Sequence, residues 1–203
     1  MRWLDRLLRR PALPEGVVLE PEEHVVAVAE VAGGGHVVAT SRGLWLPEAQ
    51  RLRWHLISKA TWEGGALRVT PAREVETVAG AVLIADEPPR KLRLATPGKV
   101  PEAVHKRVTG SIKSRHHRDL PGGGAWFVQR SVAGRDGVIL QVRADPGTDV
   151  DVVRQVARNV VLVFTRNGRS FTEQRGPDRV RFANDLAEQI RRRAITGSGY
   201  RAL

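Results

Sequence analysis

Apolar and polar residues alternate along most of residues 17–97, in short runs broken by turn residues. Alternation with a period of two, rich in valine and leucine, is typical of half-buried β-strands, and glycine clusters mark the turns between them. The pattern predicts strands over residues 24–31, 36–40, 42–46, 51–57, 59–62, 66–70, 78–85 and 91–95. Strands at this spacing indicate an antiparallel sandwich or a strongly bent sheet.

The alternation is clearest over residues 51–57, which predicts a strand with one buried and one exposed face. The expected buried residues are Leu52, Trp54 and Leu56, and the expected exposed residues are Arg51, Arg53 and His55. Because a shift of register by one residue would exchange the two faces, burial at these six positions tests the prediction.

Helical spacing follows at residues 100–114. Pro101 lies near the expected first turn, and Glu102 follows it, where a carboxylate suits the helix dipole. Val104, Val108 and Ile112 recur four residues apart, so we expect them to form the buried stripe of this helix.

Residues 116–203 predict a smaller region of mixed structure. Runs at 125–132 and 138–143 predict a β-hairpin, because an Asp-Gly turn signal lies between them. A helix is expected from about residue 150 onward, although the β-branched run at its end is compatible with helix or strand. Residues 178–194 have the periodicity of a final amphipathic helix.

The first ten residues predict a short amphipathic helix. At about 100° per residue, its apolar face consists of Trp3, Leu4, Leu7 and Leu8. We expect this face to dock on a membrane surface or on a partner protein. The alternative is packing on its own domain, since an isolated helix of this length is marginal in water.

Two short motifs resemble those of bacterial PH-like domains of the GRAM or PH type. A strand ends in Thr-x-Arg at residues 40–42, and Ile-Ser-Lys at 57–59 leads into a strand and a glycine turn. The resemblance covers residues 15–115, which is half of the chain. The same segment also resembles actinobacterial proteins. It implies an α+β fold, a PH-like antiparallel β-sandwich or barrel capped by a helix, followed here by a small β-hairpin and helices. It also implies a binding scaffold rather than an enzyme.

Three parts are therefore expected: an N-terminal amphipathic helix at 1–14, a PH-like domain at 15–115 and a basic α/β extension at 116–203. Charge separates the two halves of the chain. Its 203 residues include 33 Lys or Arg and 22 Asp or Glu, a net charge of +11, of which residues 101–203 contribute +9. This imbalance is typical of proteins that bind an acidic partner, and the alternative is a solvated basic surface.

The densest basic segment lies within residues 105–118. The predicted anion-binding residues are His105, Lys106, Arg107, Lys113, Arg115, His116 and Arg118. We expect them to contact an acidic protein or an anionic lipid surface, aided by a weak apolar contact through the Trp3 helix. The first rival hypothesis is a nucleic-acid-associated protein that binds phosphates with its basic C-terminal half.

No motif predicts a catalytic centre, a cofactor or a metal site. Cysteine is absent, which excludes a disulfide scaffold and a thiol nucleophile. No apolar run reaches the roughly 18 residues of a membrane span, and no secretory signal is expected. The expected function is therefore a non-enzymatic binding or scaffold module, in the cytoplasm or peripherally on a membrane. A small enzyme with a site between the two regions is the second alternative.

Overall fold

A computed structural model of the chain describes residues 13–166, with side chains described as far as residue 160. The chain divides into two compact units, Met1–Arg158 and Asn159–Leu203. Of the second unit, the described residues include only the end of one helix. The helices predicted over residues 1–10, with Trp3, Leu4, Leu7 and Leu8, and over residues 178–194 lie outside the described residues.

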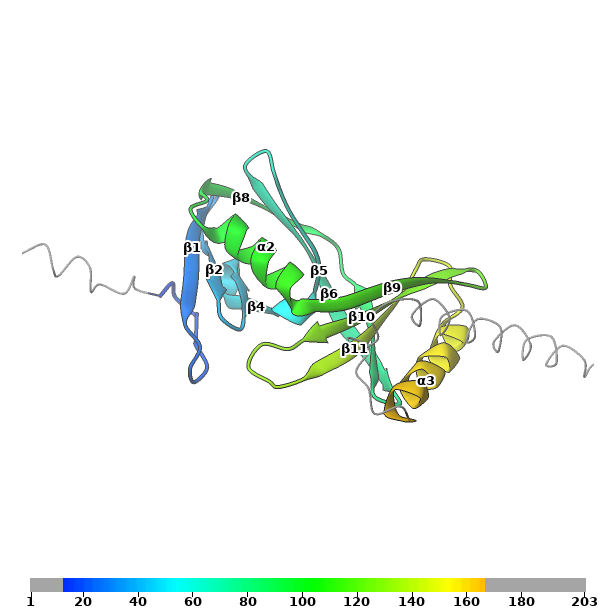
Figure 1. The fold of residues 1–203 in the computed structure, drawn as a ribbon. Coiled ribbons are helices and arrows are strands. Elements are labelled where there is room, and N and C mark those ends of the chain that lie inside the picture. The colour runs from blue at the N-terminus through cyan, green and yellow to red at the C-terminus, as the bar shows by residue number, and fades with distance from the viewer. Residues whose placement is uncertain (1–12, 167–203) are drawn as a thin grey trace, which may run out of the picture. The chain divides into compact units, whose positions relative to one another are not determined.

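The described residues form an α+β fold that consists mainly of β-strands (Figure 1). The strands are β1 Val25–Val31, β2 His36–Thr40, β3 Gly43–Leu46, β4 Gln50–Arg53, β5 Ile57–Glu63, β6 Ala66–Val78, β7 Ala81–Asp86, β8 Arg90–Thr96, β9 Ile112–Leu120, β10 Gly123–Ser131 and β11 Val138–Ala144. The helices are α2 Val100–Ser111 and α3 Val150–Arg166, with two 3-10 turns, η1 Pro47–Ala49 and η2 Trp54–Leu56. None of the described helices is both long and apolar enough to cross a membrane.

The strands pair in the order β4-β3-β2-β1-β8-β6-β7-β11-β10-β9, and β5 pairs with β6 beside this path. Strand β6 joins the two parts of the sheet, because its first half pairs with β5 and β8 and its second half with β7. Pro71 lies at the changeover, next to a register shift in the β5 pairing. A proline fits there because it lacks the N–H that a regular ladder position requires.

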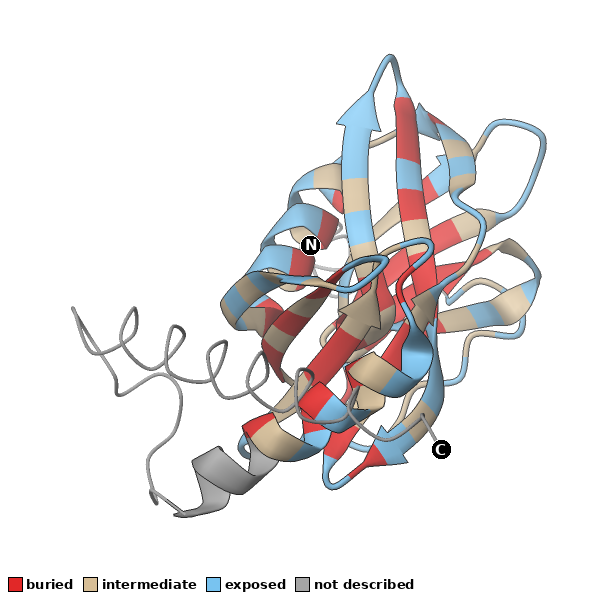
Figure 2. Ribbon diagram, turned by 90° about the vertical axis from the view of Figure 1, so that its right-hand side faces the viewer, coloured by how far each residue is buried: buried red, intermediate tan, exposed pale blue. Residues whose placement is uncertain are grey.

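The N-terminal core fills the space between the first strands and α2. Helix α2 contributes Val100, Val104 and Val108 to a core cluster that also contains Leu44 and Trp54. Buried and exposed positions are interspersed along several strands (Figure 2), whereas β2 and β3 are buried almost throughout. The predicted helix is confirmed, but Ile112 does not belong to its buried stripe, since the helix ends at Ser111.

The strand predicted over residues 51–57 is wrong in its second half. Strand β4 ends at Arg53, and the turn η2 follows it. Leu52 and Trp54 are buried as predicted, whereas His55 is buried instead of exposed and Leu56 is only half-buried. A 3-10 turn does not send alternate side chains to opposite faces, so the two-residue period fails there.

Two glutamates attach the segment before β1 to the sheet. The Glu23 side chain has no exposed surface; it accepts a hydrogen bond from Thr40 and lies 3.1 Å from Nη2 of Arg51. Glu20 pairs with Nη1 of Arg42 at 2.8 Å and with Nη1 of Arg51 at 2.6 Å. The hydrogen bonds from Arg42 and Arg51 lower the pKa of Glu20 to about 2. Arg51, expected to be exposed, is therefore half-buried in an ion-pair network.

Candidate binding face on the β9–β10 hairpin

The basic segment predicted to bind anions divides between a helix and a strand. On α2, His105 and Lys106 are exposed and Arg107 is half-buried. Its other four members, Lys113, Arg115, His116 and Arg118, lie on β9, which the sequence analysis did not identify as a strand. The seven residues therefore do not form one continuous row.

Side chains on β9 alternate between exposed and half-buried from one end of the strand to the other. Lys113 and Arg115 lie on the exposed face, and His117 lies on it as well. His116 and Arg118 lie on the opposite face, where burial lowers the pKa of Arg118. The strand thus separates the predicted set into two faces and brings His117, which was not predicted, to the open one.

An aromatic ring lies beside these cations on the neighbouring strand. Trp126 of β10 is directly opposite His117, and their ring centroids are 4.9 Å apart at an interplanar angle of 55°. Cζ of Arg115 lies 6.0 Å from the centroid of the Trp126 ring, which is within the range of a cation–π contact. Arg143 of β11 is opposite Trp126 on its other side. We call Lys113, Arg115, His117 and Trp126 the hairpin face.

His117 is fixed in orientation by a carboxylate. Its Nε2 lies 2.6 Å from Oδ2 of Asp145, and its Nδ1 lies 3.7 Å from Oδ1 of Asp119. The imidazole lies over Gly124, where an added Cβ would meet Nε2 at 2.6 Å and the carbonyl oxygen of Arg118 at 2.8 Å. Only the absence of a side chain at Gly124 leaves room for this arrangement.

Replacing Gly124 with alanine is expected to displace the His117 ring and to destabilise the fold by about 1–3 kcal/mol, the usual cost of overpacking. Urea denaturation followed by circular dichroism would measure the loss, and the NMR signal of the His117 ring would report its displacement. Gly110→Ala is the control, because Gly110 does not have a positive φ and an added Cβ there would meet nothing within 4 Å. A Gly124 variant as stable as the wild type would contradict the steric argument.

The basic groups on and beside the hairpin face differ in whether they already have an acidic partner. Arg143 pairs with Asp86 at 2.9 Å, and His117 pairs with Asp145. Lys113 and Arg115 form no ion pair with any residue that the structure describes. An incoming anion therefore meets two exposed cations without having to break a pair first.

The opposite face of the hairpin has a structural role. Phe127 is opposite Val142 of β11, and both side chains are buried. Helix α3 lies near the adjoining strands, because Nε of Arg154 donates to Oε1 of Glu76 of β6 at 2.6 Å. That face therefore packs within the first compact unit, whereas Lys113, Arg115 and His117 on the other side are exposed.

Buried polar contacts attach the hairpin to the N-terminal core. Nη1 of Arg130 donates to the carbonyl oxygen of Trp54 at 3.1 Å and to Oγ of Ser111 at 3.2 Å. Nε2 of Gln141 donates to the carbonyl oxygen of His55 at 3.0 Å. Burial lowers the pKa of Arg130 to about 10 and, with the charges of nearby arginines, lowers that of His55 to about 4. The hairpin is therefore attached to the N-terminal core through buried hydrogen bonds.

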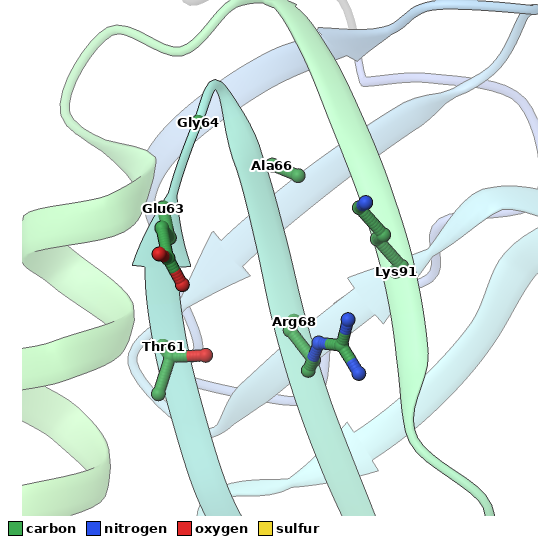
Figure 3. Close-up of a pocket in the computed structure, with 6 residues that line it drawn as sticks. All are labelled: Thr61, Glu63, Gly64, Ala66, Arg68 and Lys91. Atoms are coloured by element: carbon green, nitrogen blue, oxygen red, sulfur yellow. The ribbon is translucent and has the colours of Figure 1, made fainter.

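A second group of cations lies on the other part of the sheet. Arg68 of β6 and Lys91 of β8 line a pocket of about 200 Å³ with Thr61 and Glu63 of the β5–β6 hairpin (Figure 3). Small-molecule sites are usually larger, about 300–1,000 Å³. No group of three or more potential metal ligands occurs within residues 13–166. This surface lacks the aromatic contact of the hairpin face and is suited to serve as its control.

Comparisons of the chain with protein-family models, with curated proteins and with solved structures find no significant match. Of the two cationic surfaces, only the hairpin face joins exposed cations to an aromatic ring, a fixed imidazole and a buried support.

Proposed function

We propose that the protein is a non-enzymatic binding module whose hairpin face contacts an acidic surface of a partner protein. The observation that carries the proposal is the exposed pair Lys113 and Arg115, two residues apart on one strand face and without ion pairs among the described residues. The contact with Trp126 orients Arg115. A guanidinium that is already oriented loses less freedom when it binds a carboxylate through paired hydrogen bonds.

The surroundings favour carboxylates over a nucleic acid. Arg115 and His117 already lie against the Trp126 ring, so a base could stack there only by displacing them. Asp119 and Asp145 stand beside the face and would repel a continuous phosphate backbone. Short clusters of carboxylates can avoid these two groups, and an acidic protein surface supplies such clusters.

The scaffold beneath the face supports the PH-like interpretation of residues 15–115. Eight strands precede α2 in the chain, and α2 covers the core that those strands form. Strand β9 follows α2 directly, so the scaffold positions the hairpin that carries the binding face. A domain with a basic hairpin at one end of its sheet is suited to docking on an acidic partner.

Fluorescently labelled poly-L-glutamate, titrated with the full chain and followed by anisotropy, tests the proposed function. We expect binding that weakens with salt, and we expect Arg115→Glu to lower the affinity at least about tenfold, or about 1.4 kcal/mol. Lys91→Glu is the matched control, because it makes the same change of charge at an exposed position on β8. Its affinity should stay within about twofold of the wild type.

Equal losses in the two variants would show that net charge alone attracts the polymer, and the proposed function would be wrong. Polyuridylate and phosphatidylserine vesicles complete the experiment. If either binds more tightly than polyglutamate and loses affinity with Arg115→Glu, the hairpin face serves a nucleic acid or a membrane instead.

A further inference from the structure

We propose that the acidic partner segment binds in an extended conformation, as an added strand along the outer edge of β9. This inference rests on the proposed function and specifies the form of the partner. Strand β9 stands at the end of the sheet order, and among the described residues it pairs with β10 alone. The edge of such a strand presents backbone N–H and C=O groups that a further strand can pair with.

The two ends of the strand order differ in how well they suit this role. At the far end, β4 has four residues and is followed at once by the turn η2. At the near end, β9 has nine residues with unbroken alternation. Its pairing with β10 is continuous from Leu120 to Ser114, and the register shifts at Lys113, between Ser114 and Ile112. An incoming segment therefore meets a long, regular edge at β9.

The charges on β9 match an acidic strand in both sign and spacing. Lys113, Arg115 and His117 follow one another at intervals of two residues on the exposed face. Side chains on one face of an added strand have the same interval, and directly opposite Cβ atoms lie about 4.5–5.5 Å apart. A segment with an acidic residue at every second position would place carboxylates opposite Lys113 and Arg115, which have no ion pair among the described residues, and would end beside His117, whose Nε2 already contacts Asp145.

The same charges disfavour a second copy of this chain as the added strand. Two β9 edges would bring together faces that each carry three basic groups and one carboxylate, that of Asp119. Like charges opposite one another destabilise strand pairing, and basic side chains on an edge are a known means of preventing it. Asp119 also repels an acidic segment at that end, so the segment should lie over residues 113–117.

Three labelled heptapeptides of alternating glutamate and threonine test the inference. One is unmodified, one carries N-methyl groups on every glutamate and one on every threonine, so that the net charge is the same in all three. In an added strand, the N–H groups of the glutamates and those of the threonines lie on opposite edges, and only one of these edges faces β9. N-methyl groups on the edge that faces β9 remove its hydrogen-bond donors. We expect one methylated peptide to bind at least about tenfold more weakly than the unmodified one. The other should bind as the unmodified peptide does.

Amide hydrogen exchange in the full chain gives a second, independent measurement. Saturation with the unmodified peptide should slow exchange at alternate amides of β9 at least about tenfold, and should leave β4 unchanged. Equal affinities of the three peptides, together with unchanged exchange in β9, would overturn strand addition. In that case Arg115-dependent binding of polyglutamate would still support the proposed function, so the two failures are distinguishable.

Discussion

Replacing Glu23 with alanine is expected to lower the free energy of unfolding by about 3 kcal/mol, at the lower end of the range for breaking a buried ion pair. The Glu23 side chain is fully buried, and both of its oxygens accept hydrogen bonds from Nη2 of Arg51 at 3.1 Å. Its loss leaves part of the Arg51 charge and the backbone N–H of Glu20 without their acceptor, whereas the hydroxyl of Thr40 still has the carbonyl oxygen of Gly43 at 2.9 Å. The effect stays at the low end because Arg51 keeps its pair with Glu20.

Urea denaturation followed by tryptophan fluorescence would measure the change in Glu23→Ala. Glu20→Ala is the matched control, because Glu20 belongs to the same network and binds Arg51 as well, but its side chain is 37% exposed. We expect a clearly smaller loss in the control, since water replaces a lost partner there. Equal losses in the two variants would show that burial of Glu23 contributes nothing, and the argument would fail.

The sequence pattern predicts most strands of the N-terminal region because the apolar side chains of those strands enter a core. Val37 and Leu44 are fully buried and belong to predicted strands, and Val104 and Val108 are buried on the predicted helix. The hairpin of β10 and β11 is also confirmed. In each case the period of the apolar residues reflects a surface that the tertiary structure covers.

Strand β9 escapes prediction because it lies at the edge of the sheet and lacks an apolar face. Its central residues are polar on both sides, so no alternation of hydrophobicity is visible. A signal was nevertheless present in Pro121 followed by Gly122, a pair typical of a tight turn between two strands. Gly122 indeed has φ +82°. A turn implies a strand on each side, and the sequence pattern predicts β10 on one of them.

The members of the hairpin face could not be selected from sequence proximity. The basic residues at 105–118 are close in the chain, but the end of α2 and the alternation of β9 separate them. Trp126, by contrast, reaches His117 only through the pairing of β9 with β10. Such a set depends on register, which is fixed by the turn and by the buried Phe127 on the opposite face.

The stability of the protein is expected to fall by about 3 kcal/mol as the pH decreases from 6.5 to 4, through His55 alone. Burial, with the charges of Arg53, Arg130 and Arg135, lowers the pKa of His55 from 6.5 to about 4. In this range the unfolded chain binds a proton at His55 and the folded chain does not, so acid favours unfolding. Above pH 6.5 both states are neutral at His55, and the contribution vanishes.

His55→Gln isolates this contribution, because glutamine keeps a neutral polar side chain but cannot titrate. Urea denaturation at pH 7, 6, 5 and 4 should show that the variant loses stability less steeply than the wild type below pH 6.5. His105→Gln, which changes an exposed histidine on α2, should follow the wild type. The backbone carbonyl of His55 accepts the hydrogen bond from Gln141 in either case, so the hairpin keeps its support. Parallel curves for wild type and His55→Gln would place the origin of any acid sensitivity elsewhere.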